Sequence, residues 1–241
     1  MNEAMERIEL LIQKEGCLKL QNACVLVVGV GGVGSYSAES LARCGVGQLI
    51  LVDADTVAPS NLNRQIHATY ETIDKAKTTV MKERIATYNR DCIVIEKNMF
   101  YDAEHENEIF DRPIDFVIDA IDTITCKVDL IEACLKRKIP FISSMGMANR
   151  FDPSKIDSRD LMKTEYDPLS KVMRNIVRKR RIKGKIPVVF SREIPVTQTK
   201  VINEDGKTRK EKMPPSSTPF VPCAAGLMCA SIAVRKILEM K

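Results

Sequence analysis

The feature that most constrains this chain is a short apolar strand that breaks into glycines. Residues 25–28 read VLVV, and GVGGVG at 29–34 follows before a helical pattern begins. A strand, a tight glycine turn and a helix in this order predict a site for an anionic nucleotide. Side chains in the turn would keep phosphate oxygens from the backbone N–H groups, and the helix N-terminus adds about half a positive charge. We expect Gly29, Gly31 and Gly32 to lie against the nucleotide.

A second apolar run, at 48–52, ends in Asp53. A doubly wound sheet places an acid at this point to bind a ribose hydroxyl, so we expect that role for Asp53. The pattern up to here suits any dinucleotide enzyme, and a glycine-rich turn also occurs without a ligand.

Polar and cationic side chains follow this acid. Arg64 comes shortly after it, and Lys77 lies thirteen positions beyond Arg64. An oxidoreductase needs no cations beyond its pyrophosphate turn, whereas cleavage of ATP between its α- and β-phosphates develops charge that guanidinium and ammonium groups neutralise. Either cation alone is typical of a solvated surface, but the two together favour ATP chemistry. We expect catalytic roles for Arg64 and Lys77, and nucleotide contacts from Asp55, Ser60 and Asn61.

Asp122 lies at the carboxyl end of an expected buried strand, at 115–120, where open α/β sheets bind ligands. Magnesium prefers one or two carboxylates plus phosphate oxygens, so Asp122 is the expected Mg²⁺ ligand. The alternative is that Asp122 caps the following helix, but Thr123 can fill that role. We also expect Thr123 to contact the nucleotide and Lys127 to point into the same cleft.

These residues resemble the ubiquitin-activating-type (ThiF-type) adenylating enzymes, whose members join AMP to a carboxylate. The resemblance rests on GVGGVGS, on LVDADTV followed by SNLNRQIHA, and on VIDAIDT at 117–123. Within that family the chain is most similar to the tRNA threonylcarbamoyladenosine dehydratases, in the stretches LARCGVG, NRQIHA, ERI, CLKRKIPFISSMG, VVFSRE and FVPCAAG.

The resemblance implies ATP-dependent adenylation of the carboxylate of threonylcarbamoyladenosine in tRNA, with Mg²⁺, and then ring closure with net loss of water. It further implies a homodimer in which Arg7 reaches the nucleotide of the other subunit; an ordinary exposed arginine is the alternative. It leaves open a partner that accepts sulfur or a cysteine desulfurase. Some relatives carry a zinc clasp of two C-x-x-C pairs, whereas none of the eight cysteines here has that spacing, so no zinc is expected.

Charge is unevenly distributed along the chain. The net charge is +5, but residues 151–241 hold 20 Lys and Arg against 10 Asp and Glu, so residues 1–150 are acidic. Residues 171–185, here called the basic segment, contain eight Lys or Arg and no acid. Such one-sided charge costs self-repulsion unless an anion approaches, and predicts a tRNA-backbone surface. The expected RNA contacts are Lys171, Arg174, Arg178, Lys179, Arg180 and Arg181.

The predicted fold is α/β: a Rossmann-like, mainly parallel sheet with helices on both faces, plus a basic helical and β-hairpin elaboration and a C-terminal helix. One domain is expected. It comprises an N-terminal helix within 1–20, an ATP-binding core at 21–149, the elaboration at 150–219 with a polar loop at 203–219, and the final helix at 220–241. Within these, we expect a helix over 3–15 ended by Gly16, helices over 36–43 and 74–88, and hairpin strands at 188–191 and 195–202.

No run reaches the roughly 18 uncharged apolar residues of a membrane span, and the N-terminus is too charged for a signal peptide, so a cytoplasmic protein is expected. Cys223 follows Pro222 at a helix start, where the helix dipole lowers a thiol pKa. It is therefore a candidate acyl acceptor, although a small packing residue is the favoured interpretation. His67 is interpreted as a packing or capping residue rather than a base.

Three other functions compete with this interpretation. One is an activating enzyme for a ubiquitin-like or sulfur-carrier protein, which the missing zinc clasp and the basic segment disfavour. Another is an NAD-dependent dehydrogenase, in which Asp53 would fit but Asn61, Arg64 and Lys77 would be idle. The third is a tRNA-binding protein without catalytic activity.

Overall fold

A seven-stranded sheet forms the centre of the computed structural model, which describes residues 3–196 and 215–240. The strand order is β3-β2-β1-β4-β5-β7-β6. All pairs are parallel except the last, in which edge strand β6 runs antiparallel to β7. The strands are β1 (Cys24–Val28), β2 (Gln48–Val52), β3 (Ile93–Lys97), β4 (Phe116–Asp119), β5 (Phe141–Ser144), β6 (Ile156–Asp160) and β7 (Pro187–Ser191). The predicted Rossmann-like, mainly parallel sheet is confirmed.

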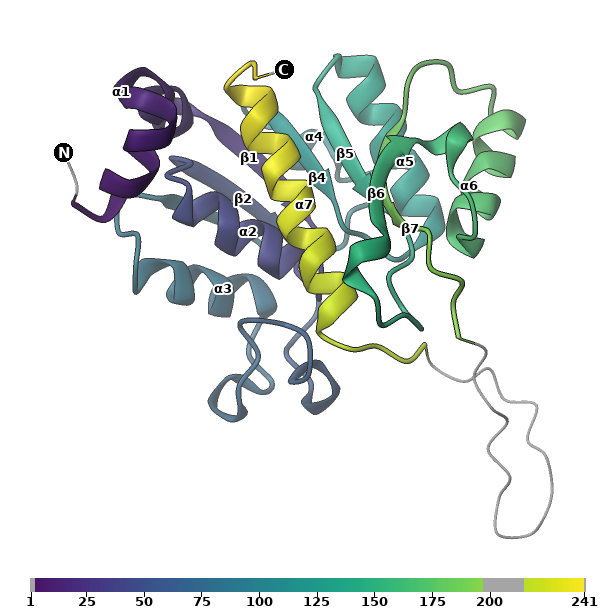
Figure 1. Ribbon diagram of the computed structural model, residues 1–241, viewed down its shortest axis with the longest axis horizontal. Coiled ribbons are helices and arrows are strands. Elements are labelled where there is room, and N and C mark those ends of the chain that lie inside the picture. The colour runs from purple at the N-terminus through teal and green to yellow at the C-terminus, as the bar shows by residue number, and fades with distance from the viewer. Residues whose placement is uncertain (1–2, 197–214, 241) are drawn as a thin grey trace, which may run out of the picture.

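Helices cover both faces of this sheet (Figure 1). On one side lie α1 (Glu6–Asn22), α2 (Gly34–Arg43), α3 (Lys77–Ala86) and α7 (Phe220–Ile237); on the other lie α4 (Glu106–Ile109), α5 (Ile124–Arg137) and α6 (Pro168–Lys179). Strand β1 is apolar throughout because its side chains pack into the cores on both faces of the sheet. Val25 and Val27 face the first core while Leu26 and Val28 face the second, so every position is buried.

The strand order reverses direction at β1, and this reversal fixes where a ligand can bind. The chain passes from β1 through α2 to β2 and then to β3 on one side, and then returns to place β4 on the other side of β1. The crossovers therefore leave a crevice at the carboxyl ends of β1 and β4, as in other doubly wound sheets.

Helix α7 crosses one face of the sheet beside α2 (Figure 1). Within the described residues it is the one helix that is long and apolar enough to cross a membrane, judged by length and composition alone. The sequence pattern predicts no membrane-spanning run, so this helix differs from that expectation. Val221, Ala225, Cys229 and Ala233 on this helix are fully buried in the core, and a core helix passes the same test.

Helix α1 differs from its prediction. It continues to Asn22, and the buried Gly16 lies inside it rather than ending it. Gln13 has φ 63° and ψ 170°, which kinks the helix. Ile8 and Ile12 pack against the core, but Leu11 is 77% exposed, because the 3.6-residue period does not hold across a kink.

The elaboration after residue 149 extends the central sheet. Strand β7 occupies the predicted 188–191 region, but its antiparallel partner is β6, which the sequence did not reveal. Helix α6 lies between β6 and β7 in the chain, so the pair is not a hairpin. The expected strand at 195–202 is absent at 195–196, and 197–202 lie outside the described residues, as does most of the expected loop at 203–219. Strand β6 reads IDSRD and is only partly buried, which hides it from hydrophobic patterning.

Gly226 tests the close contact between α7 and α2. A Cβ atom there would lie 2.3 Å from the Val33 carbonyl oxygen and 2.9 Å from the Tyr36 Cβ. Since backbone must shift to admit it, Gly226→Ala should lower the free energy of unfolding, measured in urea, by about 1–3 kcal/mol. The matched control is Leu227→Ala, at a side chain that is 51% exposed, and it should change stability by less than about 1 kcal/mol. Equal losses in the two variants would contradict this packing.

Candidate active site

A cavity of about 430 Å³ opens at the carboxyl ends of β1, β2, β4 and β5. It occupies the crevice that the strand order creates. Ten of the residues expected from the sequence line it: Gly29, Gly31, Gly32, Asp53, Asp55, Asn61, Arg64, Lys77, Asp122 and Thr123. Of the expected nucleotide contacts, Ser60 is not among the lining residues, although its carbonyl oxygen accepts a 2.7 Å hydrogen bond from Arg64 Nη1.

The glycine turn begins at Gly29, which has φ 88°. Its N–H donates to the Val52 carbonyl, and a Cβ atom on it would lie 2.6 Å from the Ala120 carbonyl oxygen. Only glycine fits both the left-handed backbone and this close approach of β1 to the end of β4. The turn thus brings three strand ends together at the cavity floor.

Asp53 follows β2 and is held by backbone donors. Its Oδ2 accepts 2.7 Å from Val30 N–H in the glycine turn, and its Oδ1 accepts 2.8 Å from Asp55 N–H. Burial raises the pKa of Asp53, against the opposing effects of Lys77 and of these two N–H groups. The carboxylate therefore links the turn to the β2 end and lies where a ribose hydroxyl donor would stabilise its charged form.

Lys77 begins α3, three residues later than predicted, because Asp74 takes a positive φ of 66° before it. The ammonium is almost buried and lies 2.6 Å from Asp55 Oδ2 and 3.8 Å from Asp53 Oδ1. Burial alone would disfavour a charged lysine in this cavity, and these two carboxylates stabilise it. A phosphate could take over one of these contacts.

Arg64 lies beside the glycine turn. Its Nη1 donates to the Ser60 carbonyl and, at 2.9 Å, to Asn63 Oδ1. A Cβ atom on Gly32 would lie 3.3 Å from Arg64 Cγ, so the absence of a side chain at Gly32 makes room for the arginine stem. Both predicted cations thus face the same cavity.

Two aspartates of the motif VIDAIDT have different surroundings. Asp119 is buried and forms an ion pair with the equally buried Lys127, at 2.9 Å. Ser143 donates to Asp119 at 2.6 Å and accepts from Lys127 at 3.2 Å. The prediction that Lys127 points into the cleft is therefore wrong, since its ammonium is used inside the core.

Asp122 is exposed at the mouth of the cavity, with Oδ1 3.5 Å from Thr123 Oγ1. No group of three or more histidine, cysteine, aspartate or glutamate side chains suited to a metal ion occurs in residues 3–196 and 215–240. A single exposed carboxylate at the mouth of this cavity fits a Mg²⁺ ion whose remaining ligands would be phosphate oxygens and water.

Other predicted residues lie away from the cavity. Arg7 is exposed on α1 and is not in the cavity lining. In the basic segment, Arg174 donates to the Thr164 carbonyl at 3.1 Å, and Arg180 pairs with Asp129 and, at 3.0 Å, with Glu132. The remaining expected RNA contacts, all exposed, are Lys171, Arg178, Lys179 and Arg181.

Cys223 does not have the activated thiol that a helix start suggested. Burial raises its pKa, although a hydrogen bond with Tyr36 opposes this effect. Its Sγ lies 3.8 Å from the Arg64 carbonyl oxygen. The packing interpretation fits this environment better than that of an acyl acceptor.

Several lining residues were not predicted from the sequence. Gln65 is buried, and its Oε1 has no hydrogen-bond partner within the described residues. Residues 144–148, which we call the β5 wall, close the side of the cavity opposite Asp53. Their position at the carboxyl end of β5 was the available signal, but SMGMA contains no charge to suggest a role.

The chain is similar to known proteins over nearly its whole length. The ThiF family model matches residues 5–240. The chain is 48% identical to the tRNA threonylcarbamoyladenosine dehydratase of Bacillus subtilis, over 99% of this chain and 96% of that protein. Its structure is similar to that of Escherichia coli tRNA N6-threonylcarbamoyladenosine dehydratase in complex with ATP, with a TM-score of 0.87 and 32% identity over 98% of this chain and 94% of that one. The complex of the E. coli protein with AMP gives a TM-score of 0.88.

His67 provides a pH test of the cavity's surroundings. It is 2% exposed, and burial together with Lys77 and Arg84 lowers its pKa from 6.5 to about 4. The unfolded imidazole binds a proton below about pH 6.5 while the folded one does not, so stability should fall as pH drops from 6.5 to 4, by on the order of 3 kcal/mol. Urea unfolding should show this loss in the wild type but not in His67→Gln.

The exposed His105 supplies the matched control, because the chain has two histidines. His105→Gln should retain the wild-type decrease between pH 6.5 and 4. If His67→Gln loses stability over this range as steeply as the wild type, His67 is not held neutral by burial.

Proposed function

Because this chain belongs to the ThiF family over nearly its whole length, we propose that it adenylates the carboxylate of threonylcarbamoyladenosine in tRNA and then closes a ring on it. The observation that carries the proposal is the convergence of Asp53, Arg64, Lys77 and Asp122 with the glycine turn in one cavity. The B. subtilis and E. coli proteins that it resembles are tRNA threonylcarbamoyladenosine dehydratases, and the E. coli protein binds ATP and AMP.

The chemistry proceeds in two steps. A carboxylate oxygen of the substrate attacks the α-phosphorus of ATP, the bond to the β-phosphate oxygen breaks, and pyrophosphate leaves. A nucleophile of the same modified nucleoside then attacks the activated carbonyl carbon, loses its proton, and displaces AMP. The carboxylate oxygen leaves in AMP, so the nucleoside loses one water in total while the enzyme needs no nucleophile of its own.

Each cavity residue has a role that its position supports. The glycine turn lies against the phosphates and Asp53 holds the ribose. Arg64 and Lys77 neutralise the charge that develops as pyrophosphate leaves, in a site where burial strengthens each interaction. Asp122 would hold the Mg²⁺, which neutralises phosphate charge when bound. Arg64 and Lys77 have no evident use in a dehydrogenase.

Four exposed cations of the basic segment would bind the RNA: Lys171, Arg178, Lys179 and Arg181. Contacts from these side chains to phosphates predict binding that weakens with salt. We place Arg174 and Arg180 among residues that hold α6 in place, because each is engaged within the protein. The reaction would take place in the cytoplasm.

Arg7 can serve the reaction only from a second copy of the chain. It lies on α1, outside the cavity of its own subunit, and its neighbour Leu10 is 70% exposed. An exposed apolar side chain on this helix is compatible with a dimer contact. We propose a homodimer in which Arg7 reaches the partner's nucleotide.

Product analysis tests the proposed reaction. Purified protein incubated with Mg·ATP and tRNA that carries threonylcarbamoyladenosine should release AMP and pyrophosphate in equal amounts. Mass spectrometry of the digested tRNA should show a nucleoside lighter by one water, and unmodified tRNA should give neither product. Release of ADP and phosphate would rule out an adenylated intermediate.

Substitution of the two cavity cations should impair the chemical step. Arg64→Gln and Lys77→Gln should each lower kcat by about 10²–10³-fold, the usual loss when one preorganised donor to developing charge is removed. The controls are Arg90→Gln and Lys75→Gln, at exposed positions outside the cavity lining, which should keep nearly full activity. Wild-type turnover by either cavity variant would remove that residue from the mechanism.

A further inference from the structure

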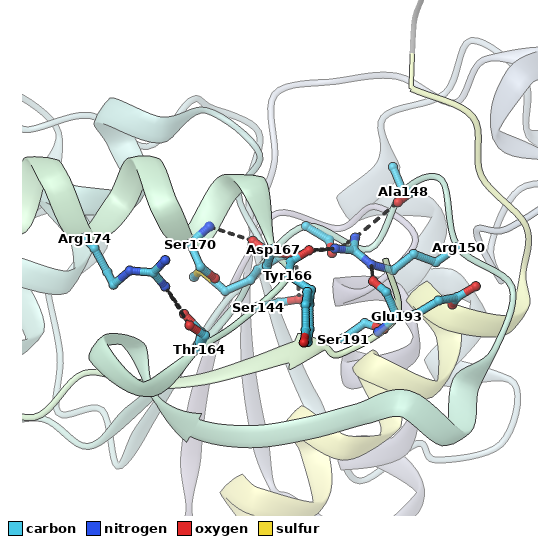
Figure 2. A network of polar contacts seen from close by, with 12 residues as sticks. Ser144, Ala148, Arg150, Thr164, Tyr166, Asp167, Ser170, Arg174, Ser191 and Glu193 are labelled. Carbon is cyan, nitrogen blue, oxygen red and sulfur yellow. Dashed lines mark hydrogen bonds and ion pairs between the residues drawn. The ribbon is translucent and has the colours of Figure 1, made fainter. Parts of the chain in front are cut away.

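A buried arginine connects the β5 wall to the rest of the elaboration (Figure 2). Arg150 is 3% exposed, and its Nη1 donates to the carbonyls of Gly146 and, at 3.2 Å, of Ala148. Its Nε donates 3.0 Å to the Glu193 carbonyl. The guanidinium thus binds two backbone oxygens of the wall and one of the segment that follows β7.

The same guanidinium binds the start of α6. Arg150 Nη2 lies 3.2 Å from Asp167 Oδ2, and both side chains are buried. The other oxygen of this carboxylate, Oδ1, accepts 2.6 Å from Ser170 N–H and caps the helix. The Asp167 carboxylate therefore fixes both the N-terminus of α6 and Arg150, which binds the β5 wall.

Asn149, the residue before Arg150, adds a second connection. It adopts φ 61°, and its Oδ1 accepts from Ser216 N–H at 2.9 Å, while its carbonyl accepts from Val196 N–H at 2.8 Å. Ser217 of the same segment lines the cavity and accepts from Asn63 Nδ2 through its carbonyl. The wall, helix α6 and residues 215–218 are thus joined at positions 149 and 150.

The strand order indicates which reactant the wall faces. Strands β2 and β5 lie on opposite sides of the β1–β4 crevice. With the ribose at Asp53 after β2 and the phosphates at the glycine turn after β1, the substrate carboxylate must approach the α-phosphorus from the β4–β5 side. The β5 wall is therefore the surface nearest to the tRNA-borne acid.

We propose that Arg150 is a positioning residue for the tRNA substrate: its pair with Asp167 sets the β5 wall relative to α6, and so aligns the RNA-bound carboxylate with the α-phosphate. This rests on the proposed function. A buried ion pair is costly and is often replaceable by apolar residues without loss of stability. What Arg150 adds is geometry: its planar guanidinium holds several N–H donors in a fixed arrangement that a lysine ammonium cannot reproduce.

Steady-state kinetics of Arg150→Gln test this role. We expect kcat/KM for modified tRNA to fall about 10–100-fold, because a small misplacement away from the reacting atoms is enough to cost that much. The Kd for ATP should remain within about twofold of wild type, because the nucleotide contacts lie on the β1, β2 and β4 side. Arg159→Gln is the matched control, at a half-exposed arginine on β6 that pairs with Asp157, and should change neither quantity.

Two further variants separate positioning from folding. Asp167→Asn retains a helix-capping oxygen but removes the charge, so it should lower kcat/KM for tRNA while α6 stays formed. Because both act through one ion pair, the Arg150→Gln/Asp167→Asn double variant should be no worse than Arg150→Gln. Arg150→Lys keeps the charge without the fork, and should also lose kcat/KM for tRNA; it replaces Arg150→Gln if that variant does not fold.

Three results would overturn the proposal. They are wild-type kcat/KM for tRNA in the Arg150 variants, parallel loss of ATP affinity, and a fall in the amount of active protein while kcat and KM per active site stay at wild-type values, which is the mark of a purely structural role. Failure of the proposed function looks different, since the wild-type protein itself would then release no AMP and pyrophosphate with modified tRNA, and the positioning role would fall with it.

Discussion

The structure depends on the ion pair between Asp119 and Lys127, buried at the carboxyl end of β4, which flanks the crevice. Desolvating two charges is expensive, and this pair is tolerable because Ser143 bonds both partners and Ile121 N–H donates to Asp119 at 3.1 Å. It joins β4, β5 and α5 directly beneath the cavity. It also fixes the turn after β4, and that turn leaves Asp122 exposed at the cavity mouth. Loss of either partner would leave a bare charge in the core.

The sequence was most informative where chemistry follows from position in a strand. Asp53 and Asp122 could be placed because each follows an expected buried strand, and parallel strands present their carboxyl ends at one edge. The fold class followed from the same pattern. Lys127 was misplaced, since one turn of helix predicts a direction but not a partner, and the buried Asp119 holds its ammonium inside the core.

The elaboration was least predictable, because its contacts join distant residues. Strand β6 has too few apolar positions to be recognised, and its register with β7 depends on the completed sheet. Arg150 lies in a segment without periodicity, and its partner Asp167 reads only as a helix cap. The charge of the basic segment is partly neutralised by Arg180 meeting Asp129 and Glu132 of α5, which composition cannot show. Sequence thus indicates an RNA surface but not which of its cations are free to act.

The two edge strands of the sheet, β6 and β3, carry charged residues that bear on how copies of the protein associate. An edge strand offers unpaired backbone groups on which another chain can assemble, and charged residues discourage this. Strand β6 carries Asp157, Arg159 and Asp160, and β3, at the other end, finishes in Glu96 and Lys97. Self-association through strand addition, the route by which exposed sheets grow into fibrils, is therefore opposed at both margins.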